Sequence, residues 1–332
     1  MNICIVGATG NVGRKILEVI EQKNFSYDEL HLVASPKSAG KKILYKKKEY
    51  LVSNLEEFDF SKCDITFFSA GGKISEKFAK KAAEHSLVID NSSYFRMDPE
   101  VPLVVPQVNP EDIKNIKKNI IANPNCSTAQ LVLVLKPLHD LFNIKRVVIS
   151  TYQSVSGAGK EPMDELLSQT KSFLENKTIE PKNFTKQIAF NAIPHIDEFQ
   201  ENGYTKEEIK LRNETKKILD SKIELSATCV RIPVLISHAE SVNIEFEKPI
   251  KLDKINSAIE SAEGCKVVDL RNDGGYVTPI EASGRFDTYI SRIREDKTIK
   301  NGLNLWIVSD NLLRGAALNA VEIAETYIKT KK

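Results

Sequence analysis

The stretch that decides the fold is residues 2–13, "NICIVGATGNVG". An apolar run, Asn2–Val6, leads into three glycines spaced three residues apart, and an amphipathic stretch, Arg14–Glu21, follows them. This order indicates a strand, a glycine turn and a helix. Glycine lets the backbone approach a pyrophosphate at the helix N-terminus, where N–H groups and the dipole favour an anion. An ordinary glycine turn is the alternative. We predict a dinucleotide site formed by Gly7, Thr9, Gly10, Asn11, Val12 and Gly13.

Further apolar runs alternate with helical patterns in the first part of the chain and predict a parallel, doubly wound sheet. These runs are Leu30–Ala34, Asp64–Ser69, Leu87–Ile89 and Ile120–Ala122. After a helix predicted from Cys126 to about Phe142, the runs become longer and partly alternating, which favours a mainly antiparallel sheet with helices on one face. The later runs are Arg146–Gln153, Glu224–Arg231, Ser241–Glu247, Phe286–Arg294 and Leu303–Ser309, with helices at Asp164–Leu174 and Lys206–Leu219.

The predicted fold class is therefore α/β in two domains: a Rossmann-type domain and an α+β catalytic and dimerisation domain. The last segment, Asn311–Lys329, has apolar residues at helical spacing, and we expect it to fold back onto the first domain. The predicted boundaries are 1–126 with 311–332 for the dinucleotide-binding domain, and 127–310 for the second domain.

The end of the second predicted strand distinguishes between the two nicotinamide cofactors. NAD-binding domains usually place Asp or Glu there, on the ribose 2′-hydroxyl. Here the strand ends in "LVASPKSAGKK" (32–42), which contains no carboxylate. Ser35, Lys37 and Ser38 offer a cation and hydroxyls to a 2′-phosphate, whereas Lys41 and Lys42 are equally consistent with solvated side chains. The sequence therefore predicts NADP.

The composition excludes several other classes of protein. A net charge of +2 argues against a dedicated nucleic-acid-binding protein, and the run Lys46–Lys48 is more typical of a solvated hairpin end. No stretch approaches the roughly 20 apolar residues of a membrane span. The N-terminus has no signal-peptide pattern, so we predict a cytoplasmic protein. Five scattered cysteines without a CxxC pair argue against a disulfide framework or a metal site.

One of these cysteines lies in an unusual setting, "IANPNCSTAQ" (121–130). Cys126 stands where a predicted strand ends and a helix begins, and a helix N-terminus stabilises a thiolate. Asn125 beside it is placed to donate to a developing oxyanion. We interpret Cys126 as a nucleophile, whereas a buried, inert thiol fits Cys4, Cys63, Cys229 and Cys265 better.

A thiolate beside a nicotinamide suggests interconversion of an aldehyde and an acyl derivative through a thioester. This chemistry also needs a proton carrier. His238, in "RIPVLISHAESV" (231–242), lies where one β-run breaks before another begins. His195 follows a proline in "AIPHIDEF" and is the structural alternative.

Nine segments occur along nearly the whole chain in an order that resembles the aspartate-β-semialdehyde dehydrogenase family. They are "GATGNVG" (7–13), "SAGGKIS" (69–75), "DNSSYFR" (90–96), "VPLVVPQVNP" (101–110), "NPNCST" (123–128), "STYQSVSGAG" (150–159), "AFNAIPHID" (189–197), "SATCVRIPVLISHAES" (226–241) and "VSDNLLRGAALNAV" (308–321). Glyceraldehyde-phosphate dehydrogenases share the chemistry, but their Cys-Thr-Thr-Asn context is absent here.

The resemblance implies reversible NADPH-dependent reduction of aspartyl phosphate to aspartate semialdehyde with release of phosphate. This step belongs to lysine (through diaminopimelate), threonine, methionine and isoleucine biosynthesis. It also implies a homodimer, with a homotetramer as the alternative. The implied roles are nucleophile for Cys126, general acid/base for His238, substrate orientation for Gln153, and cofactor contact for Ser156, Gly157 and Asn311. The implied substrate contacts are Arg231 at the α-carboxylate, Arg96 and Lys210 at the phosphate, and Glu207 at the ammonium group.

These charged residues also match the implied substrate, because a molecule with a carboxylate, an ammonium group and a phosphate needs a counter-charge for each. A planar guanidinium suits bidentate capture of a carboxylate. Glu207 and Lys210 are three apart on a helical pattern and share a face, although a solvated ion pair explains them equally. Arg96 has a solvent-facing alternative. Many bacterial members of the family carry Arg where Lys37 stands, so this chain lacks the bidentate fork there.

Two other functions remain open from the sequence. The first is a phosphorylating dehydrogenase for a different acyl phosphate. The second is a catalytically silent homologue that keeps only the NADP-binding domain.

Overall fold

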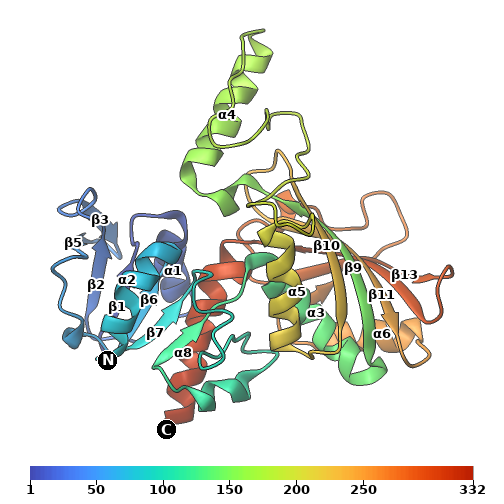
Figure 1. Cartoon of the computed structure of the whole chain (residues 1–332), viewed down its shortest axis with the longest axis horizontal. Helices are drawn as coiled ribbons and strands as arrows, with labels where there is room; N and C mark the ends of the chain where they lie inside the picture. Colours follow the sequence, from blue (N-terminus) through green and yellow to red (C-terminus); the bar gives the residue numbers. More distant parts are fainter. Residues whose placement is uncertain (332) are drawn as a thin grey trace. The chain divides into compact units, whose positions relative to one another are not determined.

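The glycine turn joins strand β1 (Ile3–Val6) to helix α1 (Asn11–Gln22) in the computed structural model, which describes residues 1–331 (Figure 1). β1 is central to a six-stranded sheet of order β5-β2-β1-β6-β7-β8, in which every adjacent pair is parallel. The predicted doubly wound parallel sheet is confirmed. β1, β6 and β7 are buried along their whole length, as expected of parallel strands covered on both faces.

The other regular elements of this part of the chain are short. They are β2 (Leu30–Ala34), β3 (Lys42–Tyr45), β4 (Lys48–Leu51), β5 (Ser53–Asn54), β6 (Ile65–Phe68), α2 (Gly72–Ala83), β7 (Leu87–Asp90), β8 (Ile120–Ala122), α8 (Leu318–Lys331) and the 3-10 turns Phe60–Lys62 and Pro110–Asn115.

The hairpin expected at the lysine run is present. β3 and β4 pair antiparallel, and Lys46 and Lys47 form the two-residue turn between them. Both have positive φ, 47° and 63°, as the turns that match the strand twist require. Their side chains are exposed, so the lysine run is a solvated hairpin end.

A second six-stranded sheet has the order β10-β9-β11-β14-β13-β12. Three adjacent pairs are antiparallel, while β9/β10 and β12/β13 are parallel, so the sheet is mixed. The elements of this part are α3 (Cys126–Phe142), β9 (Ile144–Gln153), the 3-10 turn Val155–Ala158, α4 (Lys160–Leu174), α5 (Lys206–Ile218), β10 (Glu224–Arg231), β11 (His238–Phe246), α6 (Leu252–Ser261), β12 (Cys265–Val267), α7 (Pro279–Ala282), β13 (Thr288–Asp296), β14 (Gly302–Ser309) and a π-helical turn, Leu313–Ala317.

The core of this second part lies between its sheet and helices α3, α5 and α6. Leu131, Val134, Leu135 and Leu138 of α3 pack against inward-facing residues of β9, β10, β11 and β14. The opposite face of the sheet carries the half-buried rings of Tyr152, Tyr289 and Trp306. α4 stands away from the sheet and packs in a small apolar cluster of its own (Figure 1).

Internal contacts divide the chain into two compact units. The first contains residues 1–125 and the C-terminal segment from Ala316, with α8 packed against α1 and β7. The second contains Cys126–Gly315. Within residues 1–331, no helix is both long enough and apolar enough to cross a membrane.

Candidate active site

Cys126 is the first residue of α3, as the sequence predicts. Its side chain is partly exposed, whereas Cys4, Cys63 and Cys229 are buried. Burial raises the pKa of the Cys4, Cys229 and Cys265 thiols, which keeps them protonated. Of these five cysteines, only Cys126 therefore combines access with a helix N-terminus that favours a thiolate.

The α3 N-terminus is closely approached by the π-helical turn that contains Gly315. A Cβ atom on residue 315 would lie 2.5 Å from Cys126 Cβ and 2.8 Å from its Cα. No real side chain tolerates such distances, so glycine at 315 allows the turn to pack against the residue that carries the thiol.

His238 begins β11 and is completely buried. Its Nδ1 accepts a hydrogen bond from the Ser154 backbone N–H (3.0 Å). The Ser154 hydroxyl oxygen lies 3.1 Å from the same nitrogen. A backbone N–H can only donate, so Nδ1 carries no proton and the neutral ring has its proton on Nε2. Burial, followed by the charge of Arg231, lowers the pKa of His238 to about 3. The ring is therefore a neutral hydrogen-bond donor.

Strand pairing brings Arg231 and Gln153 beside this ring. Arg231 ends β10 opposite Gln153, which ends β9, and β9 pairs on its other side with β11. The Arg231 side chain is buried and donates to the Ser154 carbonyl (2.7 Å). Burial lowers the pKa of Arg231, while Glu207 and then Cys126 raise it, so Cys126 lies within electrostatic reach of the guanidinium.

Gly157 lies directly over these two side chains. A Cβ atom there would stand 3.2 Å from His238 Nε2 and 3.4 Å from a terminal Arg231 nitrogen. The predicted cofactor residue Gly157 thus leaves space above the donor nitrogen and the guanidinium.

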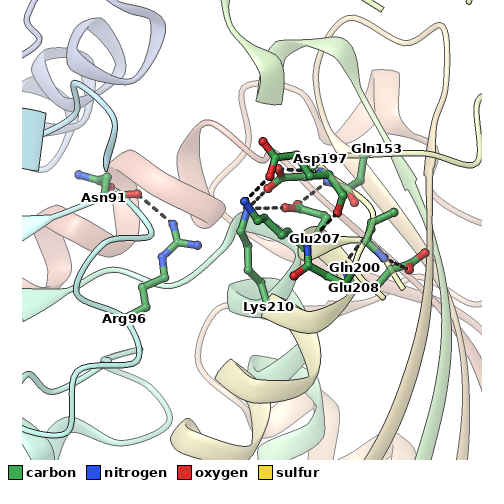
Figure 2. Close-up of polar contacts among 11 residues, drawn as sticks. Asn91, Arg96, Gln153, Asp197, Gln200, Glu207, Glu208 and Lys210 are labelled. Carbon is green, nitrogen blue, oxygen red and sulfur yellow. Dashed lines mark hydrogen bonds and ion pairs between the residues drawn. The ribbon is translucent and has the colours of Figure 1, made fainter. Parts of the chain in front are cut away.

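Glu207 and Lys210 of α5 join the same group of side chains through Gln153. Gln153 Nε2 donates to the buried Glu207 carboxylate (3.1 Å), and Lys210 Nζ lies 3.2 Å from Glu207 and 2.6 Å from Asp197. Figure 2 shows Lys210 held between the two carboxylates. Burial lowers the pKa of Lys210, but Glu207 and Asp197 outweigh it and raise the pKa overall. The ion pair that the sequence allowed is present, but it is tied to the site rather than solvated.

Asn311 and Ser156 hold the loop in front of His238 in place. Asn311 Oδ1 accepts from the Ser237 backbone N–H (2.8 Å) and from the Ser154 hydroxyl (3.1 Å). Its Nδ2 donates to Ser156 Oγ (3.0 Å). Ser237 has a φ of 79°, so this network supports a backbone conformation that serine rarely adopts. The predicted cofactor contacts at Ser156 and Asn311 stay predictions.

In the first unit, the glycine turn has the geometry of an anion-binding site. Gly7 has a φ of +84°, and a Cβ on Gly13 would lie 2.3 Å from the Gly7 carbonyl oxygen. Gly10 precedes α1 and provides no side-chain cap to the helix N-terminus. Asn11, Val12 and Gly13, which follow Thr9 and Gly10, form the first turn of this helix. Ser35, Lys37 and Ser38 follow the carboxyl end of β2, with Ser35 and Lys37 exposed.

Arg96 is buried in the first unit instead of facing solvent. Its Nε donates to the Asn123 carbonyl (2.9 Å). Its guanidinium donates to the Asn91 carbonyl (2.9 Å), as Figure 2 shows. Arg96 thus fixes the backbone two residues before Asn125, which is also buried.

Four residues that contribute to this arrangement were not predicted from the sequence: Ser154, Asp197, Ser237 and Gly315. Asp197 lies in "AFNAIPHID", where an acidic residue next to a candidate substrate helix was the available signal. Ser154 acts through its backbone and its hydroxyl, Ser237 through its backbone N–H, and Gly315 through its lack of a side chain. The sequence offers no signal for these contacts. Among the residues described, no group of three or more His, Cys, Asp or Glu side chains is arranged to hold a metal ion.

Comparison with known proteins agrees with both units. Residues 2–116 match the family model "Semialdehyde dehydrogenase, NAD binding domain", and residues 135–314 match "Semialdehyde dehydrogenase, dimerisation domain". Aspartate-semialdehyde dehydrogenases from Aquifex aeolicus and Campylobacter jejuni are 52% and 50% identical, covering 98% and 99% of this chain and 98% of each relative.

Two solved structures extend this similarity. Aspartate semialdehyde dehydrogenase II from Vibrio cholerae, complexed with ASA, has a TM-score of 0.96 at 46% identity, over 99% of this chain and 98% of that one. Aspartate semialdehyde dehydrogenase from Candida albicans, solved with NADP, has a TM-score of 0.74 at 26% identity, over 99% of this chain and 98% of that one.

Fold and site together define a two-domain semialdehyde dehydrogenase with a nicotinamide-dinucleotide-binding domain and a dimerisation domain. Within that class, the chain belongs to the aspartate-semialdehyde dehydrogenase family. It is an oxidoreductase of aspartate-family amino-acid biosynthesis, and the expectation from the nine sequence segments is confirmed.

Replacing Gly315 with alanine is expected to displace the thiol. Because the new Cβ would overlap Cys126 Cβ, the first turn of α3 must shift, and a misplacement of about 1 Å can cost up to about 100-fold in rate. We expect at least about a tenfold fall in kcat with retained secondary structure. Steady-state kinetics and circular dichroism test this. A folded variant with wild-type kcat would contradict the close packing.

Because the His238 ring is buried and neutral, its contribution to the stability of the fold is expected to decrease as pH falls. The ring has its ordinary pKa of 6.5 when unfolded and about 3 when folded. The unfolded state therefore binds the proton first as pH falls, so the contribution is complete above pH 6.5 and is lost towards pH 3.

We expect wild type to lose about 1.4 kcal/mol per pH unit more than His238→Asn in this window. The measurement is the free energy of urea unfolding of both proteins across that range. Parallel curves would show that the folded ring titrates normally.

Proposed function

We propose that this chain converts L-aspartyl 4-phosphate to L-aspartate 4-semialdehyde reversibly, through a thioester on Cys126. The observation that carries the proposal is the grouping of an accessible helix-N-terminal thiol, a buried guanidinium and a neutral histidine within one unit. The similarity to a Vibrio cholerae relative solved with ASA supports the substrate class.

In the reductive direction, the Cys126 thiolate attacks the acyl carbon of the substrate. A carbon–sulfur bond forms, the carbon–oxygen bond to phosphate breaks, and the electron pair leaves with phosphate. Bound NADPH supplies the hydride that reduces the thioester. The resulting thiohemiacetal oxyanion collapses to the aldehyde, and the carbon–sulfur electron pair returns to Cys126 as thiolate.

His238 serves both oxyanions of this sequence. Its Nε2–H faces the space left by Gly157 and donates to the oxygen that becomes negative. A neutral imidazole that gave up this proton would become an anion, so the resting ring acts as a hydrogen-bond donor. To act as a general acid, the ring must first bind a second proton at Nδ1, which requires that atom to release the Ser154 N–H. The negative charges of the substrate favour this by raising the pKa of His238 in the complex, and the ring then gives its Nε2 proton to the departing phosphate. Asn125 is proposed as a second donor to the thioester oxygen.

Charged side chains match the three charges of the substrate. Arg231 binds the α-carboxylate, because its planar guanidinium suits bidentate capture and Ser154 already fixes its orientation. Glu207 binds the ammonium group while Gln153, hydrogen-bonded to it, orients the substrate. Lys210 and Arg96 take the phosphate, and Lys210 exchanges its contact with Asp197 for the phosphate on binding.

The cofactor proposed is NADP. The α1 N-terminus after the glycine turn and the close packing of Gly13 on Gly7 fit a pyrophosphate, and the exposed Lys37 with Ser35 and Ser38 fits a 2′-phosphate. Ser156, Gly157 and Asn311 are proposed to border the nicotinamide. The Candida albicans relative solved with NADP supports this choice.

The proposed assembly is a homodimer formed through the matched dimerisation domain, with a homotetramer as the alternative. We further propose a cytoplasmic location, in keeping with a substrate from central amino-acid metabolism.

Removal of the nucleophile is the first test. Cys126→Ala should retain less than about a thousandth of wild-type turnover, because it removes the covalent step. The assay is phosphate-dependent reduction of NADP by aspartate semialdehyde. Cys63→Ala, a buried thiol of the other unit, is the matched control and should keep its activity. Substantial activity in Cys126→Ala would exclude the thioester.

Charge reversal at Lys37 tests the cofactor assignment. Lys37→Glu should raise KM for NADP far more than KM for NAD, because a carboxylate repels a 2′-phosphate. Lys41→Glu, an exposed lysine in the following turn, is the control and should affect both cofactors little. Equal losses for NADP and NAD in Lys37→Glu would remove the 2′-phosphate assignment.

A further inference from the structure

A buried carboxyl, Glu240, lies beneath the candidate active site and has no part in the reaction described above. It is two residues after His238 on β11, so both side chains point to the same face of the sheet. Glu240 is 0% exposed, and neither of its oxygens has a hydrogen-bond partner among residues 1–331. A buried polar group without a partner is costly, so its presence on this face needs a reason.

Strand register places Glu240 at the border between the site and the apolar core. It pairs with Thr151 of β9, which pairs in turn with Cys229 of β10. The row next to it holds Gln153 and Arg231, and Thr151 donates to the Gln153 side chain (2.9 Å). Val242, two residues further along β11, already belongs to the apolar core. Glu240 therefore lies between the apolar core and the site residues Gln153 and Arg231.

The helix that carries Cys126 covers this position. Gln130 of α3 is also completely buried, and both of its amide atoms lack hydrogen-bond partners among the described residues. It is four residues after Cys126, one turn along the same helix face. Gln130 faces Glu240 closely enough to act on its pKa. Two buried polar side chains, one on the sheet and one on the catalytic helix, thus lie near each other, and neither has another hydrogen-bond partner within residues 1–331.

We propose that Glu240 is a positioning residue: its carboxyl and the Gln130 amide form the contact that fixes the first turn of α3, and with it the Cys126 thiol, above the sheet. This inference rests on the proposed nucleophilic role of Cys126.

The protonation state of Glu240 fits this contact. Burial raises the pKa of Glu240 well above its usual value, and Gln130, which lowers it, does not compensate. The titratable groups around it, Cys229 of β10 and His238 of β11, are neutral. A neutral carboxylic acid has one donor and one acceptor, as does the facing edge of a primary amide. The pair can therefore close two complementary hydrogen bonds.

The test compares an isosteric amide with an isosteric apolar side chain. Glu240→Gln keeps a donor and an acceptor, so we expect it to retain wild-type kcat. Glu240→Leu removes both, so kcat should fall at least about tenfold while KM for aspartate semialdehyde stays near wild type. Gln130→Leu should show the same loss, and the double variant no further loss, because the two side chains act as one contact.

A second readout separates positioning from general stability. The rate of iodoacetamide alkylation of Cys126 is measured against pH, which reports the thiolate independently of turnover. We expect Glu240→Leu and Gln130→Leu to shift this profile and Glu240→Gln to leave it unchanged. Glu245→Gln, further along β11 and paired with Lys145 at the surface, is the matched control.

Two results would overturn the proposal. One is wild-type kcat and an unchanged alkylation profile in either leucine variant. The other is a loss in Glu240→Gln as large as in Glu240→Leu, which would assign a role to charge. If Glu240→Leu does not fold, the kcat values and alkylation profiles of Gln130→Leu and Glu240→Gln test the proposal. Failure of the thioester mechanism would be seen separately, as activity in Cys126→Ala.

Discussion

The pairing of β9 with β10 on one side and β11 on the other is the constraint on which the rest of the site depends. Parallel pairing aligns Gln153 with Arg231, and antiparallel pairing brings the start of β11, His238, to the same end of the sheet. A shift of one residue in either register would turn these side chains to the opposite face. The apolar core beneath, which α3, α5 and α6 cover, fixes the register and so fixes the chemistry above it.

The site depends secondly on how buried charges are distributed around Gln153, Arg231 and His238. Arg231 and Glu207 are both buried, and the attraction between their opposite charges offsets part of the cost of burying them. His238 stays neutral because burial and the nearby guanidinium both lower its pKa. The Ser154 backbone links the two, since its N–H fixes the His238 tautomer and its carbonyl holds Arg231. A neutral ring with a defined donor nitrogen is the consequence, and it suits a site where negative charge develops on oxygen.

Much of this could be predicted from the sequence, because the signals were local. The glycine turn, the start of α3 at Cys126, the hairpin at Lys46–Lys47 and the change to a mainly antiparallel sheet each follow from a short pattern of residue types. The two parallel pairs, β9/β10 and β12/β13, were not predicted. Nine segments in a fixed order then identified the family, which the full-length relatives confirm.

What the sequence by itself determined was the residue types and their place on elements: a cysteine at a helix start, an arginine and a histidine at strand ends, and a lysine where a carboxylate would select NAD. Only the tertiary structure decided their state. The neutral tautomer of His238, the need for glycine at 315 and the burial of Glu240 beside Gln130 all arise from contacts between segments far apart in the chain. Burial and close approach are properties of packing, and no local pattern of residues encodes them.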